Sequence, residues 1–245
     1  MRILLLLWLL PVCVWAQDWS VEVEKLLDSK QYAKAQQHLQ TQLDKQPQNW
    51  KALELMGDVY CHQELWDQAI EAYKQVVAAT PEQAHLQYKY GGAMGMKSLQ
   101  VSKFKALGMI DDIEEAFLKA ASLDPQHLET RWALVQLYMK LPGIVGGSKK
   151  KALLYANELQ ALSLVDGYLA KGFIYQYDKD YPEAETHFRK AIKVGGSVTC
   201  YTQLADCYLA QDKTQQALIT LQEAATKHPS STVISQKMET IKNKG

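Results

Sequence analysis

The sequence predicts an all-α fold, a right-handed α-solenoid of about six stacked helix-turn-helix units followed by a closing C-terminal helix. Three observations support this prediction. Small and aromatic residues recur every 33 or 34 residues. Only 13 of the 245 residues are Gly and 7 are Pro, too few for the many turns of a β-sandwich or barrel. The 13 Tyr and 6 Trp suit helices that are joined by short turns.

The overall composition is that of an ordinary globular protein. Hydrophobic residues make up 47% and charged residues 22% of the chain. The 27 basic residues balance the 27 acidic ones, so the net charge is zero. A general nucleic-acid-binding protein would show a basic excess, and we therefore expect no nucleic-acid partner.

The N-terminus has the features of a secretion signal. Residues 3–10 form an unbroken apolar run, which is shorter than the roughly 20 residues that a spanning helix needs. Small side chains at Val14 and Ala16 fit a signal-peptidase site, so we predict cleavage between Ala16 and Gln17. Residues 1–16 are then a signal peptide, and the mature chain is periplasmic or extracellular.

Two alternatives to cleavage stay open at this end of the chain. One is a lipid anchor at Cys13, although Val12 is bulky where a lipobox prefers a small residue. The other is an uncleaved apolar anchor.

The repeat is clearest in residues 50–83. Its pattern consists of Trp50, Leu53, Met56-Gly57, Tyr60, Trp66, Ala69, Tyr73 and Pro81. This spacing resembles the tetratricopeptide repeat, W-x2-L-G-x2-Y, then A-x3-F, then P. The resemblance implies two antiparallel helices per unit, close approach of the helices at the small residues, and stacking of units that cannot fold alone. It covers the mature chain, residues 17–245.

The same register divides the chain into six units, each with its own matching residues. They are 16–49 (Trp19, Tyr32, Ala35, Pro47), 50–83, 84–127 (Gly91, Phe117, Ala120, Pro125), 128–164 (Trp132, Tyr138, Ala152), 165–197 (Gly172, Ala184, Phe188, Ala191) and 198–231 (Tyr208, Ala217, Ala224, Pro229). Residues 232–244 form the closing helix, with Val233, Ile234, Met238 and Ile241 on one stripe. Helix N-caps are expected at Asp180, Asp212, Ser148, Ser197 and Ser230.

Two departures from the repeat are candidates for function. The third unit carries about ten extra residues between Met94 and Ile110. We expect lengthened helices there, which serve either as a docking or oligomer contact or as a harmless length variant.

The second departure is the turn from Pro142 to Ser148, which precedes three lysines. It lacks the G-x4-G-K-[ST] spacing of a phosphate loop, so we reject nucleotide hydrolysis. Either it is a structural turn, or free backbone N–H groups hold an anion or a partner. The residues of this candidate site are Gly146, Gly147, Ser148 and Lys149. The P-x3-G-G-S sequence is also similar to a subgroup of secreted bacterial tetratricopeptide proteins.

The resemblance implies that the first helix of each unit lines a concave groove. Carried over by position, the central groove residues are aromatic, apolar or amide side chains: Tyr88, Trp132, Gln136, Leu169, Phe173 and Tyr177. Exposed apolar strips of this kind mark partner or ligand sites. The alternative is that these side chains pack on one another.

Catalytic chemistry has little support in the sequence. The six His residues are scattered, and neither H-E-x-x-H nor G-x-S-x-G occurs. We expect no catalytic residues, no metal site and no cofactor, and predict that the protein is not an enzyme.

The resulting hypothesis is a secreted scaffold that binds an unidentified protein partner in its groove. Contact with a membrane is expected only through an envelope partner, and a homo-oligomer is left open. A distant similarity to the T-component of TRAP-type transporters supports an alternative, a transport accessory that binds a small apolar ligand or a substrate-binding protein. A weaker similarity to the regulator of microtubule dynamics family disagrees with the signal peptide.

Overall fold

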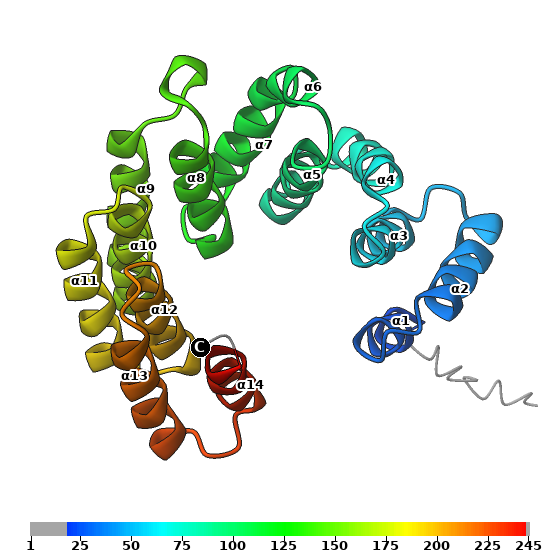
Figure 1. Cartoon of the computed structure of the whole chain (residues 1–245). Coiled ribbons are helices and arrows are strands. Elements are labelled where there is room, and N and C mark those ends of the chain that lie inside the picture. Colours follow the sequence, from blue (N-terminus) through cyan, green and yellow to red (C-terminus); the bar gives the residue numbers. More distant parts are fainter. Residues whose placement is uncertain (1–18, 244–245) are drawn as a thin grey trace, which may run out of the picture. The chain divides into compact units, whose positions relative to one another are not determined.

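The computed structural model describes residues 19–243, and its regular elements within that range are all helical (Figure 1). The first helices of successive pairs are α1 (Trp19–Asp28), α3 (Trp50–His62), α5 (Ala84–Ser98), α8 (Leu128–Lys140), α10 (Leu164–Tyr177) and α12 (Val198–Leu209). The second helices are α2 (Tyr32–Lys45), α4 (Trp66–Ala79), α7 (Ile110–Leu123), α9 (Lys149–Leu162), α11 (Tyr181–Val194) and α13 (Thr214–Lys227). The helix α14 (Thr232–Lys242) follows. The predicted all-α solenoid of helix-turn-helix units is confirmed, while the predicted signal peptide lies outside the described residues.

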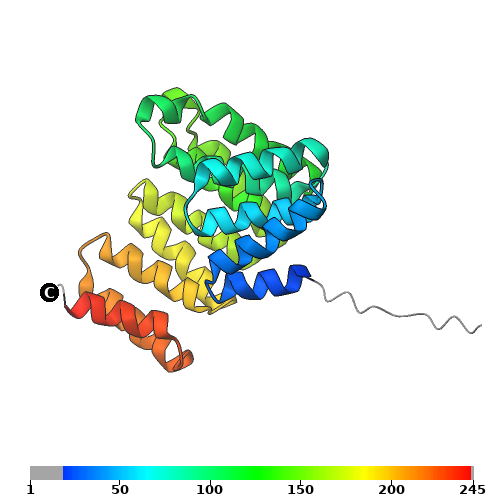
Figure 2. The same cartoon turned by 90° about the vertical axis from the view of Figure 1, so that its right-hand side faces the viewer.

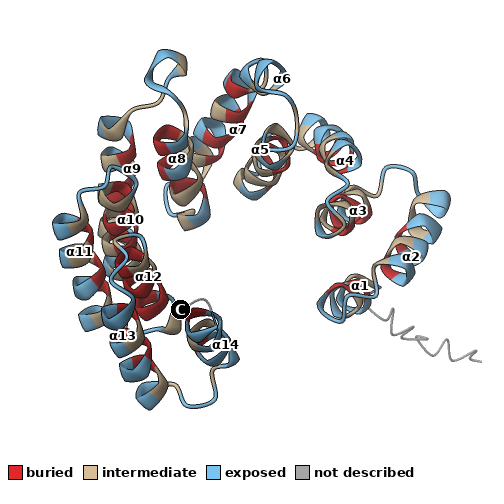
Figure 3. Cartoon of the chain, in the orientation of Figure 1, coloured by how far each residue is buried: buried red, intermediate tan, exposed pale blue. Residues whose placement is uncertain are grey.

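The described residues divide into two compact units, one that ends at Ala79 and one that begins at Thr80. In the first, α1 to α3 enclose a core that includes Val23, Leu39 and Val59, all fully buried. The C-terminal part of the second has a core of its own around Phe188, Tyr201 and Leu221, also fully buried. Figure 3 shows the buried residues on the sides of the helices that face their neighbours.

Glycine on a first helix lets the paired second helix approach closely. A Cβ atom added to Gly57 would lie 2.5 Å from Cε1 of the Tyr73 ring, and one added to Gly172 would overlap the ring of Phe188. Each glycine precedes its aromatic partner by 16 residues. Gly91 instead meets Phe117, 26 residues later. The ten extra residues therefore lie within one helix pair, between its two helices.

The expected lengthening of the flanking helices is small: α5 has 15 residues against 13 in α3 and in α8. The helix α5 ends at Ser98 and α7 has 14 residues, as many as α4 and α9. The extra residues form a separate five-residue helix, α6 (Lys103–Leu107), which Ser102 caps by accepting a hydrogen bond from the Lys105 N–H. Gly108 follows as its C-cap, and the chain then turns into α7.

Most of the predicted N-caps are confirmed. The side chains of Ser148, Ser197 and Asp180 each accept a hydrogen bond from the backbone of the helix that they precede. Asp212 is not a cap, because its φ of 58° places it in the left-handed turn and Lys213 is the residue before α13. The cap of α14 is Ser231 rather than Ser230.

Among residues 19–243, no helix has the length and apolar character needed to cross a bilayer.

Candidate functional site

The first helices form one continuous face in the second compact unit. Among the described helices, α8 contacts α10, and α10 contacts α12, whereas no comparable contact joins the second helices α9, α11 and α13 to one another. The first helices are therefore the closer-packed layer, and their free side is the inner face. Figure 1 shows α8, α10 and α12 next to one another in this order. All six predicted groove residues lie on α5, α8 or α10.

Trp132 is fixed to the next helix pair. Its indole Nε1 donates a hydrogen bond to Oδ1 of Asp166 on α10 at 2.9 Å. The other carboxylate oxygen of Asp166 accepts a 2.6 Å bond from the Ser163 hydroxyl, which in turn caps α10. The half-buried Trp132 ring also packs on the core of the unit. Its main contact is therefore structural, since it holds α8 against α10.

Two other predicted groove residues lie mostly in the protein interior. Leu169 is 7% exposed and belongs to the core. Tyr88 packs against Phe117 and His127, with ring centroids 6.1 and 5.2 Å away. Burial, assisted by the nearby Glu129 carboxylate, raises the pKa of Tyr88, so its hydroxyl stays protonated at neutral pH. These two side chains present little free surface to a ligand.

The remaining three predicted residues make up what we call the aromatic patch: Gln136, Phe173 and Tyr177. Tyr177 is 50% exposed, and its ring lies 6.1 Å from the ring of Phe173 one helical turn earlier. Gln136 is exposed on α8, and its Oε1 accepts a hydrogen bond from Lys140 Nζ at 3.3 Å. This patch combines apolar rings with an amide that can bond to a peptide group.

In the predicted anion-binding turn, most backbone N–H groups already donate to carbonyls of the same chain. Its 3₁₀ turn η1 spans Gly143–Val145. The N–H groups of Gly146 and Gly147 donate to the carbonyls of Gly143 and Pro142, and that of Ser148 donates to Tyr138. Gly146 has a φ of 100°, and a Cβ at Gly147 would overlap the Leu141 carbonyl oxygen, so both positions require glycine.

The lysines after the turn are also engaged in contacts within the chain. The Lys149 ammonium pairs with the Asp178 carboxylate, which raises the pKa of Lys149, and lies 4.7 Å from the centroid of the Tyr175 ring. Lys151 pairs with Glu114 at 3.1 Å. These contacts support the structural-turn interpretation, and Lys150 is the one of the three lysines that pairs with no carboxylate among the described residues.

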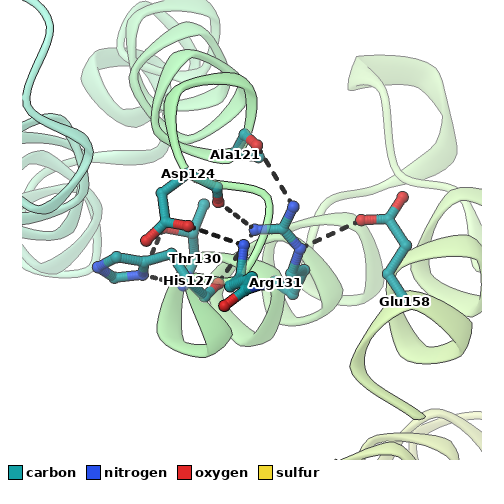
Figure 4. Close-up of polar contacts among 7 residues, drawn as sticks. Ala121, Asp124, His127, Thr130, Arg131 and Glu158 are labelled. Carbon is teal, nitrogen blue, oxygen red and sulfur yellow. Dashed lines mark hydrogen bonds and ion pairs between the residues drawn. The ribbon is translucent and has the colours of Figure 1, made fainter. Parts of the chain in front are cut away.

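A buried arginine at the junction of α7 and α8 was not found from the sequence. Arg131 is 4% exposed, and its guanidinium donates to the carbonyls of Asp124 at 2.9 Å, His127 at 3.1 Å and Ala121 at 3.3 Å (Figure 4). Its Nε also donates to Glu158 on α9 at 3.2 Å. Arg131 thus supplies donors to carbonyls at the end of α7 and in the turn before α8, and sets the position of α8.

Two family profiles of known proteins match this chain of helix pairs. A tetratricopeptide repeat profile matches residues 26–90, and a second one matches residues 164–226, together just over half of the chain. The chain belongs to the tetratricopeptide repeat family. No protein in the curated collection matches it significantly.

Solved structures with the same tetratricopeptide fold cover most of the chain at low identity. A tetratricopeptide repeat protein from Parabacteroides merdae is 15% identical over 85% of this chain and 78% of its own, with a TM-score of 0.62. A Thermus thermophilus repeat protein is 16% identical over 92% and 97%, with a TM-score of 0.55. PilW, a type IV pilus biogenesis factor, is 15% identical over 90% and 96%, with a TM-score of 0.64. At such identities these likenesses concern the fold alone.

In this tetratricopeptide protein, adjacent repeats are also joined by a tyrosine, a carboxylate and a lysine. The Tyr138 hydroxyl on α8 donates to Oε1 of Glu114 on α7 at 2.6 Å, and Lys151 on α9 bonds to the same oxygen. Burial alone would raise the pKa of Glu114, but the bonds from Tyr138 and Lys151 outweigh it and lower that pKa. The ionised carboxylate is therefore part of the folded state.

Clusters suited to metal chemistry are not found within residues 19–243, where no group of three His, Cys, Asp or Glu side chains is arranged to hold an ion. The tetratricopeptide fold is typical of protein-binding scaffolds, and the aromatic patch is the part of the predicted site that the structure leaves accessible.

Proposed function

We propose that this protein is a secreted or periplasmic scaffold, not an enzyme, which binds a segment of a protein partner at the aromatic patch. The observation that carries the proposal is the 50% exposure of Tyr177 beside Phe173, on the face formed by the first helices. A large aromatic side chain held by neighbouring rings offers contact area at low entropic cost, as binding hot spots do.

The chemistry of the patch favours an uncharged, extended partner segment. Gln136 is neutral and the other two patch residues are aromatic, so the patch itself carries no charge, although Lys140 borders it. Apolar side chains of the segment would pack on Phe173 and Tyr177, while the Gln136 amide would bond to a peptide group of its backbone. Nothing in the described residues favours the transport-accessory hypothesis.

The proposed location outside the cytoplasm rests on the N-terminal sequence. The apolar run at residues 3–10 and the small residues at Val14 and Ala16 are its support. N-terminal sequencing of the protein from an envelope fraction tests it, with a start at Gln17 expected.

The binding proposal is tested with a photo-crosslinking phenylalanine analogue placed at Tyr177. A matched control carries the analogue at Ile219, which is 55% exposed on the second helix α13. We expect one protein to crosslink at position 177 and not at 219, and the Gln136→Ala substitution to weaken that crosslink. Trp132 is unsuitable for this test because its bond to Asp166 supports the fold.

The proposal would be wrong if the two positions gave the same crosslinked proteins. It would also be wrong if the protein bound equally well with and without Tyr177→Ala while retaining its helical circular dichroism.

A further inference from the structure

Two connections that are longer than the repeat requires lie at one edge of the second compact unit. The first, residues 99–109, joins α5 to α7 and contains α6; the second, residues 141–148, joins α8 to α9 and contains η1. Both join a first helix to its own second helix. The two helices of each pair are antiparallel, and the pairs stack with their first helices running in the same direction. The connections from first to second helix therefore all lie at the same end of the stack. Figures 1 and 2 show α6 and the turn of η1 at the same end of this unit.

Each connection presents apolar side chains to solvent. Ile144 is 96% exposed and Phe104 is 86% exposed, the two most exposed large apolar side chains described. Leu99 at 66% and Leu107 at 47% accompany Phe104. Isolated exposed apolar residues are common. Two neighbouring connections that both expose large apolar side chains form a surface that needs an explanation. We call these four residues the apolar edge.

Rigid backbone holds the ends of both connections in place. Val145 N–H and Gly147 N–H both donate to the Pro142 carbonyl, which closes the turn around Ile144. On the other connection, Ser102 caps α6 and so fixes the helix that carries Phe104. The two apolar side chains are therefore presented by ordered turns.

The charged residues within residues 95–110 and 140–151 are all lysines. Lys103, Lys105 and Lys150 are exposed, and none of them pairs with a carboxylate in the part of the chain that the structure describes. Residues 95–110 and 140–151 contain no Asp or Glu.

Acidic groups at this edge lie in the neighbouring helices and turns. Glu114 and Asp178 are each paired with a lysine, Lys151 and Lys149. The other acidic groups are Asp111, Asp112 and Glu115 in the first turns of α7, where the helix dipole favours them, and Asp180, which caps α11.

We propose that the apolar edge docks on the surface of a bilayer that contains anionic lipid. Phe104 and Ile144 would enter the boundary between headgroups and acyl chains, and the three exposed lysines would contact lipid phosphates. This contact is made by the chain itself, which differs from the sequence-based expectation that a partner mediates any membrane contact. It is independent of the aromatic patch, which lies on the inner face of the helices.

Hydrogen–deuterium exchange of the full chain tests the proposal, with vesicles that contain phosphatidylglycerol and with vesicles of phosphatidylcholine alone. The readout is local, so apolar residues near the N-terminus do not decide it. We expect slower exchange in residues 99–109 and 141–148 with the anionic vesicles, and a smaller effect with the neutral ones or at high salt.

A variant with Phe104→Ser and Ile144→Ser should lose the protection and bind the vesicles about tenfold less tightly or worse, since each side chain contributes apolar area. A control with Leu154→Ser and Ile219→Ser, both more than half exposed on second helices, should behave as the native chain does. All four positions are exposed, so the fold is expected to persist and circular dichroism verifies it.

Unchanged exchange of the two segments with either vesicle would overturn the proposal, as would equal protection in the Phe104→Ser and Ile144→Ser variant. Protection of the same segments by a protein, with no effect of vesicles, would identify the apolar edge as a protein interface instead.

Discussion

Replacing Arg131 by Met should destabilise the junction of α7 and α8 far more than removing the charge of its ion-pair partner. The substitution keeps an apolar side chain of similar length but removes the guanidinium N–H groups that donate to the carbonyls of Ala121, Asp124 and His127. At about 1 kcal/mol for each lost bond, the free energy of unfolding should fall by about 3 kcal/mol. Glu158→Gln should cost less than about 1 kcal/mol, because the Glu158 side chain is 40% exposed and solvent screens the pair.

Urea unfolding followed by far-ultraviolet circular dichroism measures both costs, and hydrogen exchange shows where each variant opens. For Arg131→Met the faster exchange should be concentrated at the end of α7 and the start of α8. Equal losses in the two variants would refute this reasoning, because they would mean that the ion pair, rather than the bonds to the carbonyls, holds the junction.

Three further predictions concern individual side chains. Gly172→Ala should lower the free energy of unfolding, measured with urea, by about 1–2 kcal/mol, because the new Cβ overlaps the buried Phe188 ring. The better helix propensity of Ala recovers only part of this cost. Gly92→Ala, which places its Cβ in open space, should not lower the free energy of unfolding. The stability difference between the native chain and Glu114→Gln should be present near neutral pH and shrink as acid protonates the carboxylate below about pH 4. The lowered pKa of Glu114 in the folded state sets this direction, and urea titrations at several pH values measure it. Gly147→Ala should disrupt the turn before α9, seen as faster hydrogen exchange there, and an unaltered turn would show that the backbone can shift to accept a Cβ.

The repeat register predicted the helices well because it reports burial at fixed positions. Gly57 and Gly172 occupy equivalent positions and meet Tyr73 and Phe188 in the same way. Turn geometry was less predictable. The sequence suggested Asp212 as a helix cap. In the structure Asp212 is the left-handed residue of the turn, and the capping position falls one residue later, at Lys213.

The candidate site was harder to predict. The position of a residue in the repeat does not indicate which group its side chain hydrogen-bonds to. Trp132 lies on the predicted face, yet its indole N–H bonds to Asp166 34 residues later, one repeat length along the chain. A comparison of side chains one repeat apart could have found this pair. Arg131 occupies the fourth position of its unit, where Tyr201 is buried in the last unit, and a charged residue at a buried position was the available signal.

The close fit of glycine and aromatic ring also has a consequence for how the chain folds. Each contact closes a loop of only 16 residues, and the inserted connection extends one of them to 26. Chains dominated by such short-range contacts fold rapidly, because little loop entropy is lost before a contact forms. A helix pair can therefore assemble as soon as its second helix has left the ribosome, and the next pair then adds to a surface that already exists. We expect the pair with the longer loop, α5 and α7, to be the slowest to form.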